Sequence, residues 1–135
     1  MSAVVVGFVP TPEGRAALRR ATEEAGLRGM KLVVVTSRRG GREYDSAAAA
    51  ADQEALDGVR RELQTAGVEH DVRHLVRGRE PAEDLLEVTG EVGGAVLVIG
   101  MRRRTPVGKL LMGSNAQRIL LEAEVPVLTV KADPE

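Results

Sequence analysis

Residues 95–117, AVLVIGMRRRTPVGKLLMGSNAQ, contain the transition that decides the fold. Their first part, Ala95–Gly100, is a nearly continuous apolar run, which is typical of a strand covered on both faces in a parallel sheet. Their last part, from Ser114, has the pattern of a helix start, with Gln117 three residues later as in a capping box. A buried strand followed by a helix predicts one unit of a β-α repeat, with Gly113 directly before the helix.

The rest of the chain repeats this alternation of apolar runs and helical patterns. We predict strands at five runs: Ala3–Phe8, Lys31–Ser37, Val68–Val76, Ala95–Gly100 and Val125–Lys131. The run Val68–Val76 alternates apolar and polar residues, which fits an edge strand with one wetter face. Pro126 near the start of the last run also favours an edge position.

Helical patterns fill the segments between the strands. They run from Pro12 to about Ala25, from Ser46 to Ala66, from Pro81 onward and from Ser114 onward. Thr11 is expected to cap the first helix, and Gly26 is expected to end it. The segment SRRGGREY, residues 37–44, is predicted to be a loop.

This order of elements predicts one α/β domain over residues 1–135. We expect an open, doubly wound, Rossmann-like sheet of five parallel strands in the order 3-2-1-4-5, with helices on both faces. Ligands of such sheets bind beyond the carboxyl ends of the strands, where the strand order reverses. Residues 100–117 would therefore face the loop VPTPEG, residues 9–14, across a ligand site.

The helix start at Gly113, Ser114 and Asn115 is a candidate anion site. Free backbone N–H groups and the positive end of the helix dipole favour a phosphate there, and Gly113 has no side chain to block it. The alternative is that Gly113 serves only to make a turn and Ser114 serves only to cap the helix, with no anion bound. A P-loop is excluded, because it would need glycine at Arg103 and Ser or Thr at Leu110.

The residues of this stretch carry a family resemblance: the chain resembles the universal stress protein family over essentially its whole length. Nucleotide-binding members carry G-x2-G-x9-G-[ST] after the fourth strand, and Gly100, Gly113 and Ser114 match it. The segments RGREPAEDLLE (77–87) and LLMGSNAQRILLEAEVPVLTVK (110–131) carry the resemblance further. It implies a stress-response protein that binds ATP, with Mg²⁺ as a possible companion. It also implies a homodimer formed by antiparallel pairing of the last strands, residues 125–131.

Two positions depart from the family pattern. Arg103 replaces the middle glycine, and Val9 replaces the aspartate that usually contacts adenine in ATP-binding members. Arg102, Arg103 or Arg104 would pair with phosphate oxygens, or Arg103 would instead fill the groove and exclude nucleotide. Two hypotheses follow. One is a nucleotide site formed by Val9, Gly100, Arg102, Arg103, Gly113, Ser114 and Asn115; the other is a dimeric interaction module whose site is closed by Arg103 and Val9.

Composition argues against several other functions. The 19 basic and 20 acidic residues give a net charge of -1, and Phe8 and Tyr44 are the only aromatic residues, so a nucleic-acid surface is not expected. The chain has no cysteine, and two histidines, His70 and His74, do not complete a zinc site. No nucleophile with a paired base is visible, so we expect a binding protein and not an enzyme. No membrane span or signal peptide is expected, which fits a cytoplasmic protein.

Overall fold

The computed structural model describes residues 2–102 and 113–132. Over these residues the elements, in chain order, are β1 (Ala3–Gly7), α1 (Pro12–Arg28), β2 (Lys31–Arg38), α2 (Ser46–Ala66), β3 (His70–Val76), α3 (Pro81–Glu91), β4 (Gly94–Met101), α4 (Ser114–Glu122) and β5 (Val127–Lys131). The strands form one sheet in the order β3-β2-β1-β4-β5, and every neighbouring pair is parallel. The predicted fold class and strand order are therefore confirmed.

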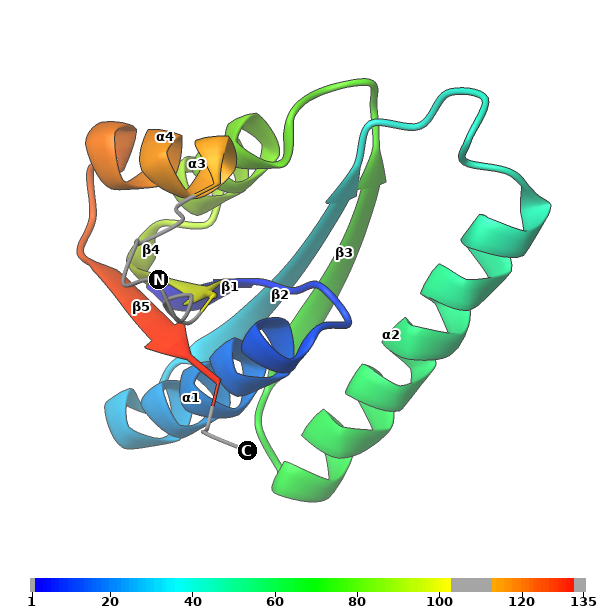
Figure 1. Cartoon of the computed structure of the whole chain (residues 1–135). Coiled ribbons are helices and arrows are strands. Elements are labelled where there is room, and N and C mark those ends of the chain that lie inside the picture. Colours follow the sequence, from blue (N-terminus) through cyan, green and yellow to red (C-terminus); the bar gives the residue numbers. More distant parts are fainter. Residues whose placement is uncertain (1, 103–112, 133–135) are drawn as a thin grey trace.

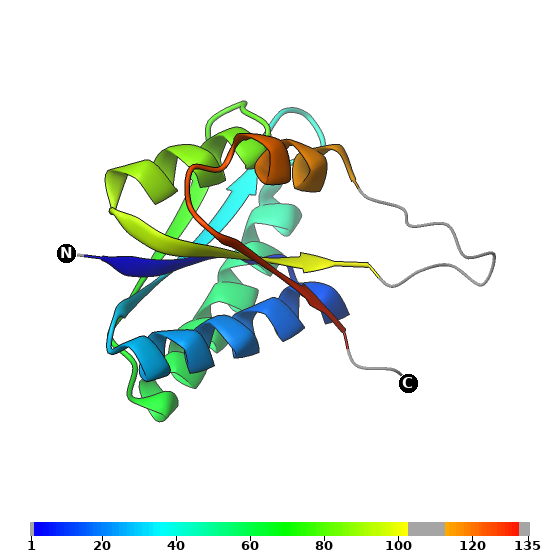
Figure 2. The same ribbon diagram turned by 90° about the vertical axis from the view of Figure 1, so that its left-hand side faces the viewer.

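The helices form two layers, one on each face of the sheet. Figures 1 and 2 show α1 and α2 on one side of the strands, and α3 and α4 on the other. Successive residues of β1 alternate between the two sides: Val4 and Val6 pack with α1 and α2, whereas Ala3 and Val5 pack with α3 and α4. This two-sided burial explains why the central strands read as continuous apolar runs.

The edge positions of β3 and β5 are confirmed, although both strands begin later than predicted. The N–H of Val68 bonds to the Leu63 carbonyl at the end of α2, so Val68 completes the helix cap and the strand begins at His70. Pro126 lies just before β5, and its carbonyl accepts from the N–H of Leu97 on β4 (3.0 Å). Proline has a carbonyl acceptor but no backbone N–H. At this position just before β5, Pro126 uses its carbonyl to pair with β4, and its missing N–H is not needed.

The two ends of α1 differ in how well the sequence predicted them. Thr11 is the N-cap, and its hydroxyl oxygen accepts from the N–H of Gly14 (3.1 Å), as expected. The predicted stop at Gly26 is wrong, because the helix continues to Arg28 and ends at Gly29. Gly29 has a φ of 63°, a left-handed conformation that favours glycine, and its N–H reaches the last carbonyls of the helix.

Asp84 ties three segments together near the carboxyl ends of the strands. It lies in the first turn of α3, and its side chain is completely buried. One carboxylate oxygen accepts from the Ser37 hydroxyl of β2 (2.6 Å), and the other accepts from the Arg77 guanidinium after β3 (2.6 Å). Burial raises the pKa of Asp84, but the bonds from Ser37 and Arg77 outweigh that effect and hold its pKa below the usual value.

We predict that Asp84→Ala lowers the free energy of unfolding at pH 7 by about 2 kcal/mol, because Ser37 and Arg77 lose their acceptor. A carboxyl with a lowered folded pKa contributes stability above its unfolded pKa of about 4, and this contribution is lost as the pH falls through the folded value. Urea titrations should therefore show the wild type and the variant converging in acid.

Asp57→Ala is the matched control, because Asp57 makes an exposed ion pair with Arg60 on α2. It should change stability by less than about 0.5 kcal/mol. A deficit in Asp84→Ala that stays constant down to pH 3 would contradict the role given to the carboxylate.

Candidate functional site

The carboxyl ends of β1 and β4 lie side by side and bring residues 9–14 near the end of β4. Val4 pairs in register with Val96, and Val6 pairs with Val98, so the chain leaves both strands on the same side of the sheet. Figure 2 shows the end of β4 and the starts of α1 and α4 on that side. Residues 9–14 therefore meet the end of β4, as predicted, and the Glu13 backbone lies directly against Gly100.

A cavity of about 430 Å³ opens between these segments. It is lined by Val9, Glu13, Gly100, Met101, Arg102, Gly113 and Ala116. Four of the predicted site residues thus share one cavity. Arg103 lies outside the described residues, so its predicted role stays a prediction. Ser114 and Asn115 follow Gly113 in the first turn of α4.

The start of α4 is arranged differently from the predicted capping box. The N-cap residue is Gly113, whose backbone is extended (φ -64°, ψ 156°), and Ser114 is already helical. The Gly113 carbonyl accepts from the N–H of Gln117 (3.0 Å), and α4 has no side-chain capping bond. The prediction that Ser114 caps the helix is wrong, because Gly113 occupies the N-cap position and Ser114 is the first helical residue. Because the cap residue is a glycine, it supplies no side-chain acceptor to the first N–H groups of α4, which favours an anion there.

Asn115 positions α4 through its side chain. Its Oδ1 accepts from the N–H of Ala82 in the first turn of α3 (3.0 Å). Glu80, the N-cap of α3, makes no side-chain capping bond, so Asn115 supplies the acceptor that Glu80 does not. This bond fixes the start of one helix against the start of the other. Sequence analysis assigned only the backbone of Asn115 to the site, since no local pattern reveals a bond across 33 residues.

The surroundings of Gly100 and Gly113 differ in whether they leave room for a side chain. A Cβ atom on Gly100 would lie 2.3 Å from the Glu13 carbonyl oxygen, so Gly100 allows α1 to approach β4 closely. A Cβ atom on Gly113 would meet no atom of the described residues within 4 Å. The close packing of α1 against β4 therefore requires glycine at position 100. Gly113 lines the cavity, and the described residues leave the space for a Cβ atom there open.

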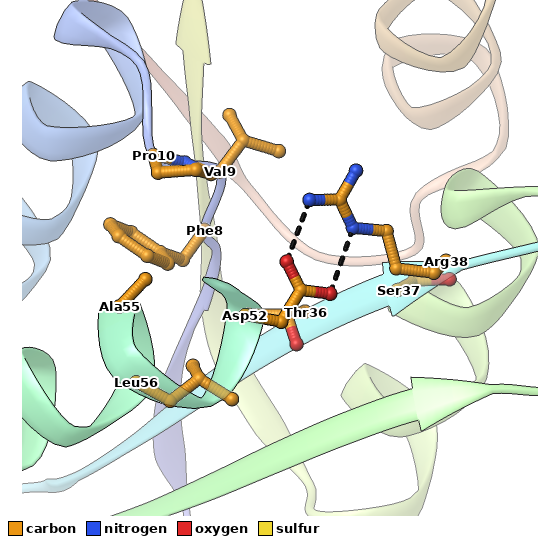
Figure 3. Close-up of a pocket in the computed structure, with 9 residues that line it drawn as sticks. All are labelled: Phe8, Val9, Pro10, Thr36, Ser37, Arg38, Asp52, Ala55 and Leu56. Atoms are coloured by element: carbon orange, nitrogen blue, oxygen red, sulfur yellow. Dashed lines mark hydrogen bonds and ion pairs between the residues drawn. The ribbon is translucent and has the colours of Figure 1, made fainter. Parts of the chain in front are cut away.

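A second, smaller pocket of about 40 Å³ lies between β1, β2 and α2. Figure 3 shows its lining residues: Phe8, Val9, Pro10, Thr36, Ser37, Arg38, Asp52, Ala55 and Leu56. Val9, which is half exposed, lines this pocket and also the larger cavity. The two hollows therefore adjoin at the end of β1.

The polar wall of this smaller pocket is an Arg38–Asp52 pair that sequence analysis did not identify. Nε and Nη2 of Arg38 donate to the two carboxylate oxygens of Asp52 at 3.1 and 2.7 Å (Figure 3). The Tyr44 hydroxyl donates to Asp52 at 3.0 Å. Burial raises the pKa of Asp52, but the bonds from Arg38 and Tyr44 outweigh it, so the pKa lies below its usual value. Asp52 is consequently a charged, fully engaged acceptor that holds Arg38 in place.

The two histidines of β3 belong to local hydrogen-bond networks. His74 contacts the Tyr44 hydroxyl through Nε2 (2.9 Å) and the Thr36 hydroxyl through Nδ1 (2.6 Å). His70 contacts the Val68 carbonyl through Nδ1 (2.8 Å). Within residues 2–102 and 113–132, no cluster of three or more His, Cys, Asp or Glu side chains is placed to hold a metal ion. No helix in the same residues has the length and apolarity of a membrane span.

Comparison with known proteins gives one family. A model of the universal stress protein family matches residues 1–131. A protein of Mycolicibacterium smegmatis named universal stress protein is 41% identical over 128 residues, which cover 95% of this chain and 96% of that protein. A universal stress protein structure from Archaeoglobus fulgidus superposes with a TM-score of 0.86 at 35% identity, covering 97% of this chain and 99% of that one.

A further structure is that of the universal stress protein from Archaeoglobus fulgidus in complex with dAMP. It superposes with a TM-score of 0.79 at 30% identity and covers 97% of this chain and 98% of that one. The sequence comparisons and the structure comparisons therefore indicate the same family and the same fold.

We predict opposite outcomes for alanine at the two glycines of the cavity. Gly100→Ala should lower the free energy of unfolding by about 2 kcal/mol, because its Cβ would overlap the backbone of α1. Gly113→Ala should change it by less than about 0.5 kcal/mol, because its Cβ meets open space. Thermal and urea unfolding of both variants tests this contrast. Equal losses of stability would show that the two glycines do not differ in packing.

Proposed function

The chain belongs to the universal stress protein family, and we propose from this premise that it binds an adenine nucleotide, with ATP as the reference ligand. The observation that carries the proposal is the cavity of about 430 Å³ at the start of α4, lined by Gly100, Arg102 and Gly113. It lies where the strand order reverses, which is the general ligand position of doubly wound sheets.

The start of α4 would hold the phosphates. Its N-cap residue, Gly113, has no side chain to occupy the first-turn N–H groups, and the helix dipole adds positive potential at the same place. The open space at Gly113 allows a phosphate to approach the backbone, and the Ser114 hydroxyl is a further donor. Arg102 lines the same cavity and adds a cation.

Glu13 is the acidic residue of the cavity lining. A carboxylate there would repel bare phosphates, and a Mg²⁺ ion carried by ATP would reduce this repulsion. We therefore propose the magnesium complex of ATP, and not free ATP, as the bound form. The dAMP complex of the Archaeoglobus fulgidus protein supports an adenine nucleotide as the ligand class.

The proposed activity is binding without dedicated turnover. Ser114 lies in the first turn of α4 beside the proposed phosphates, and a serine nucleophile needs an adjacent base. Both histidines of the chain lie on β3, which β2 and β1 separate from β4. A histidine base for Ser114 is therefore not supplied by this chain.

We also propose that two copies associate through β5. It is an edge strand, and an uncovered edge offers backbone donors and acceptors to another strand. Leu120 and Leu121 on the preceding helix are 40% and 85% exposed, which adds apolar surface to this end of the chain. An antiparallel pairing of two β5 strands would give an isologous two-fold dimer.

The first prediction of this proposal concerns the phosphate end. Calorimetry with ATP and Mg²⁺ should detect binding, and Gly113→Val should abolish it by filling the space that a phosphate would occupy. Ser114→Ala should weaken binding about fivefold, which corresponds to one hydrogen bond of roughly 1 kcal/mol. Gly26→Val, at an exposed helical glycine with open space around it, is the matched control and should leave affinity unchanged.

Absence of heat at millimolar ATP with Mg²⁺ would overturn the proposal and favour the alternative, an interaction module of the same fold with a closed site. Unchanged affinity in both Gly113→Val and Ser114→Ala would place the nucleotide elsewhere.

The second prediction concerns the edge of β5. Leu97 donates to Pro126 and pairs with Val127, so Leu128 and Val130 donate back to β4, and the N–H of Thr129 faces the open edge. Thr129→Pro should remove this donor and give a monomer in sedimentation experiments, whereas Thr129→Val should remain a dimer. A monomeric wild type, or a dimeric proline variant, would contradict pairing through β5.

A further inference from the structure

We propose that the side chain of Asn115 is a positioning group for the bound nucleotide, because it couples the start of α4 to the first turn of α3. This inference rests on the proposed nucleotide binding and goes beyond it, since the side chain sets the affinity without touching the ligand. Four observations carry it: the place of Asn115 beside the cavity, the limited burial of α4, the firm attachment of α3 and the missing side-chain cap at the start of α3.

The first observation is that Asn115 lies between two residues that line the larger cavity. Gly113 lies two positions before it and Ala116 directly after it, and both line that cavity. The Asn115 side chain extends instead to α3, where its Oδ1 accepts from the N–H of Ala82 at 3.0 Å. Asn115 therefore holds the turn whose N–H groups would receive the phosphates, while its own side chain is bonded to the neighbouring helix.

The second observation is that packing by itself constrains the start of α4 weakly. The helix has nine residues, and Ile119, in its second turn, is the buried one. Ser114 is exposed, and Ala116 is partly buried against the core. Arg118 pairs with Glu83 of α3 at 3.4 Å, but these side chains are 41% and 34% exposed, so the pair adds little. Because packing supplies most of the stability of a short helix, a directional bond at its weakly packed start has a large influence on its position.

The third observation is that the first turn of α3 is a firm support. Asp84 lies two residues after Ala82 and is completely buried. Its carboxylate accepts from the Ser37 hydroxyl and from the Arg77 guanidinium, both at 2.6 Å. Ser37 lines the smaller pocket, so one turn of α3 connects that pocket to the helix start at the larger cavity.

The fourth observation is that α3 has no side-chain cap from its own N-cap residue. Glu80 makes no capping bond and instead pairs with Arg39 at 3.0 Å. The N–H of Ala82 is bonded to Asn115, and an asparagine supplies this acceptor without placing a negative charge beside the phosphates. By linkage, a ligand that holds α4 in place also strengthens this bond, so the start of α3 responds to the nucleotide.

The variant Asn115→Ala removes the bond. It should lower the melting temperature by about 4 °C, because the start of α3 loses its acceptor. It should also weaken the binding of ATP with Mg²⁺ about tenfold in calorimetry, because the start of α4 loses its attachment. Gln64→Ala, at an exposed amide in the last turn of α2, is the matched control and should change neither quantity.

Combining Asn115→Ala with Glu80→Asp distinguishes positioning from a purely structural role. Aspartate is a favoured N-cap residue whose carboxylate reaches the N–H groups of the first turn, so the melting temperature should return to the wild-type value. This new cap makes no bond to α4, so the ATP affinity should stay about tenfold below that of the wild type. The double variant also keeps the comparison decisive where Asn115→Ala alone does not fold.

Amide hydrogen exchange tests the coupling in the opposite direction. Saturating ATP with Mg²⁺ should slow the exchange of the Ala82 N–H about fivefold in the wild type, and it should have no such effect in the double variant. The N–H of Ala48 is the internal control, because the Asp45 side chain caps it at the start of α2 (2.9 Å). Its exchange should not respond to the nucleotide.

The outcomes separate this inference from the proposed function. If ATP binds the wild type and Asn115→Ala equally, or if Glu80→Asp restores the affinity together with the stability, positioning by Asn115 is wrong and nucleotide binding stands. If ATP does not bind the wild type, the proposed function fails, and the positioning role fails with it.

Discussion

Burial of both faces of the central strands is the constraint on which the rest of this structure depends. β1 and β4 lie in the middle of the sheet, and residues such as Val5 and Val98 are completely shielded from water by helices above or below. Because a strand covered on both faces has no room for functional side chains along its length, polar chemistry is confined to the strand ends. The close contact of Gly100 with the α1 backbone shows how tightly this layer is packed where the site begins.

Polar interactions accordingly gather at the carboxyl ends of the strands, and each joins segments that are distant in sequence. Asp84 links α3 to β2 and to the segment after β3, Asn115 links α4 to α3, and Asp52 links α2 to β2. These buried or half-buried acceptors hold the loops that surround the two adjoining hollows. The candidate site is therefore a rim of positioned donors on an apolar frame, with the first turn of α4 at one end and the guanidinium of Arg38 at the other.

The local signals of the chain differ in how far they predicted this arrangement. The cap at Thr11 was predictable because the residue, the following proline and the helical spacing all agree within a few positions. The end of α1 was not, because Gly26 and Gly29 are both plausible stops, and the choice depends on which one adopts a left-handed conformation. The Ser114 cap was wrong by one residue for a similar reason, since Ser and Gly are both acceptable N-caps.

The sequence by itself determined the fold class, the strand order, the family resemblance and the cavity residues Val9, Gly100, Arg102 and Gly113. The fold class followed from apolar periodicity, which is a property of neighbouring residues, whereas Val9 and Arg102 were indicated by the family resemblance. Only the tertiary structure decided that Gly100 serves the packing of α1, that Asn115 caps a different helix, and that Arg38 is held by Asp52. These are contacts between residues that are far apart along the chain, and no local pattern encodes which distant partner a polar side chain will meet.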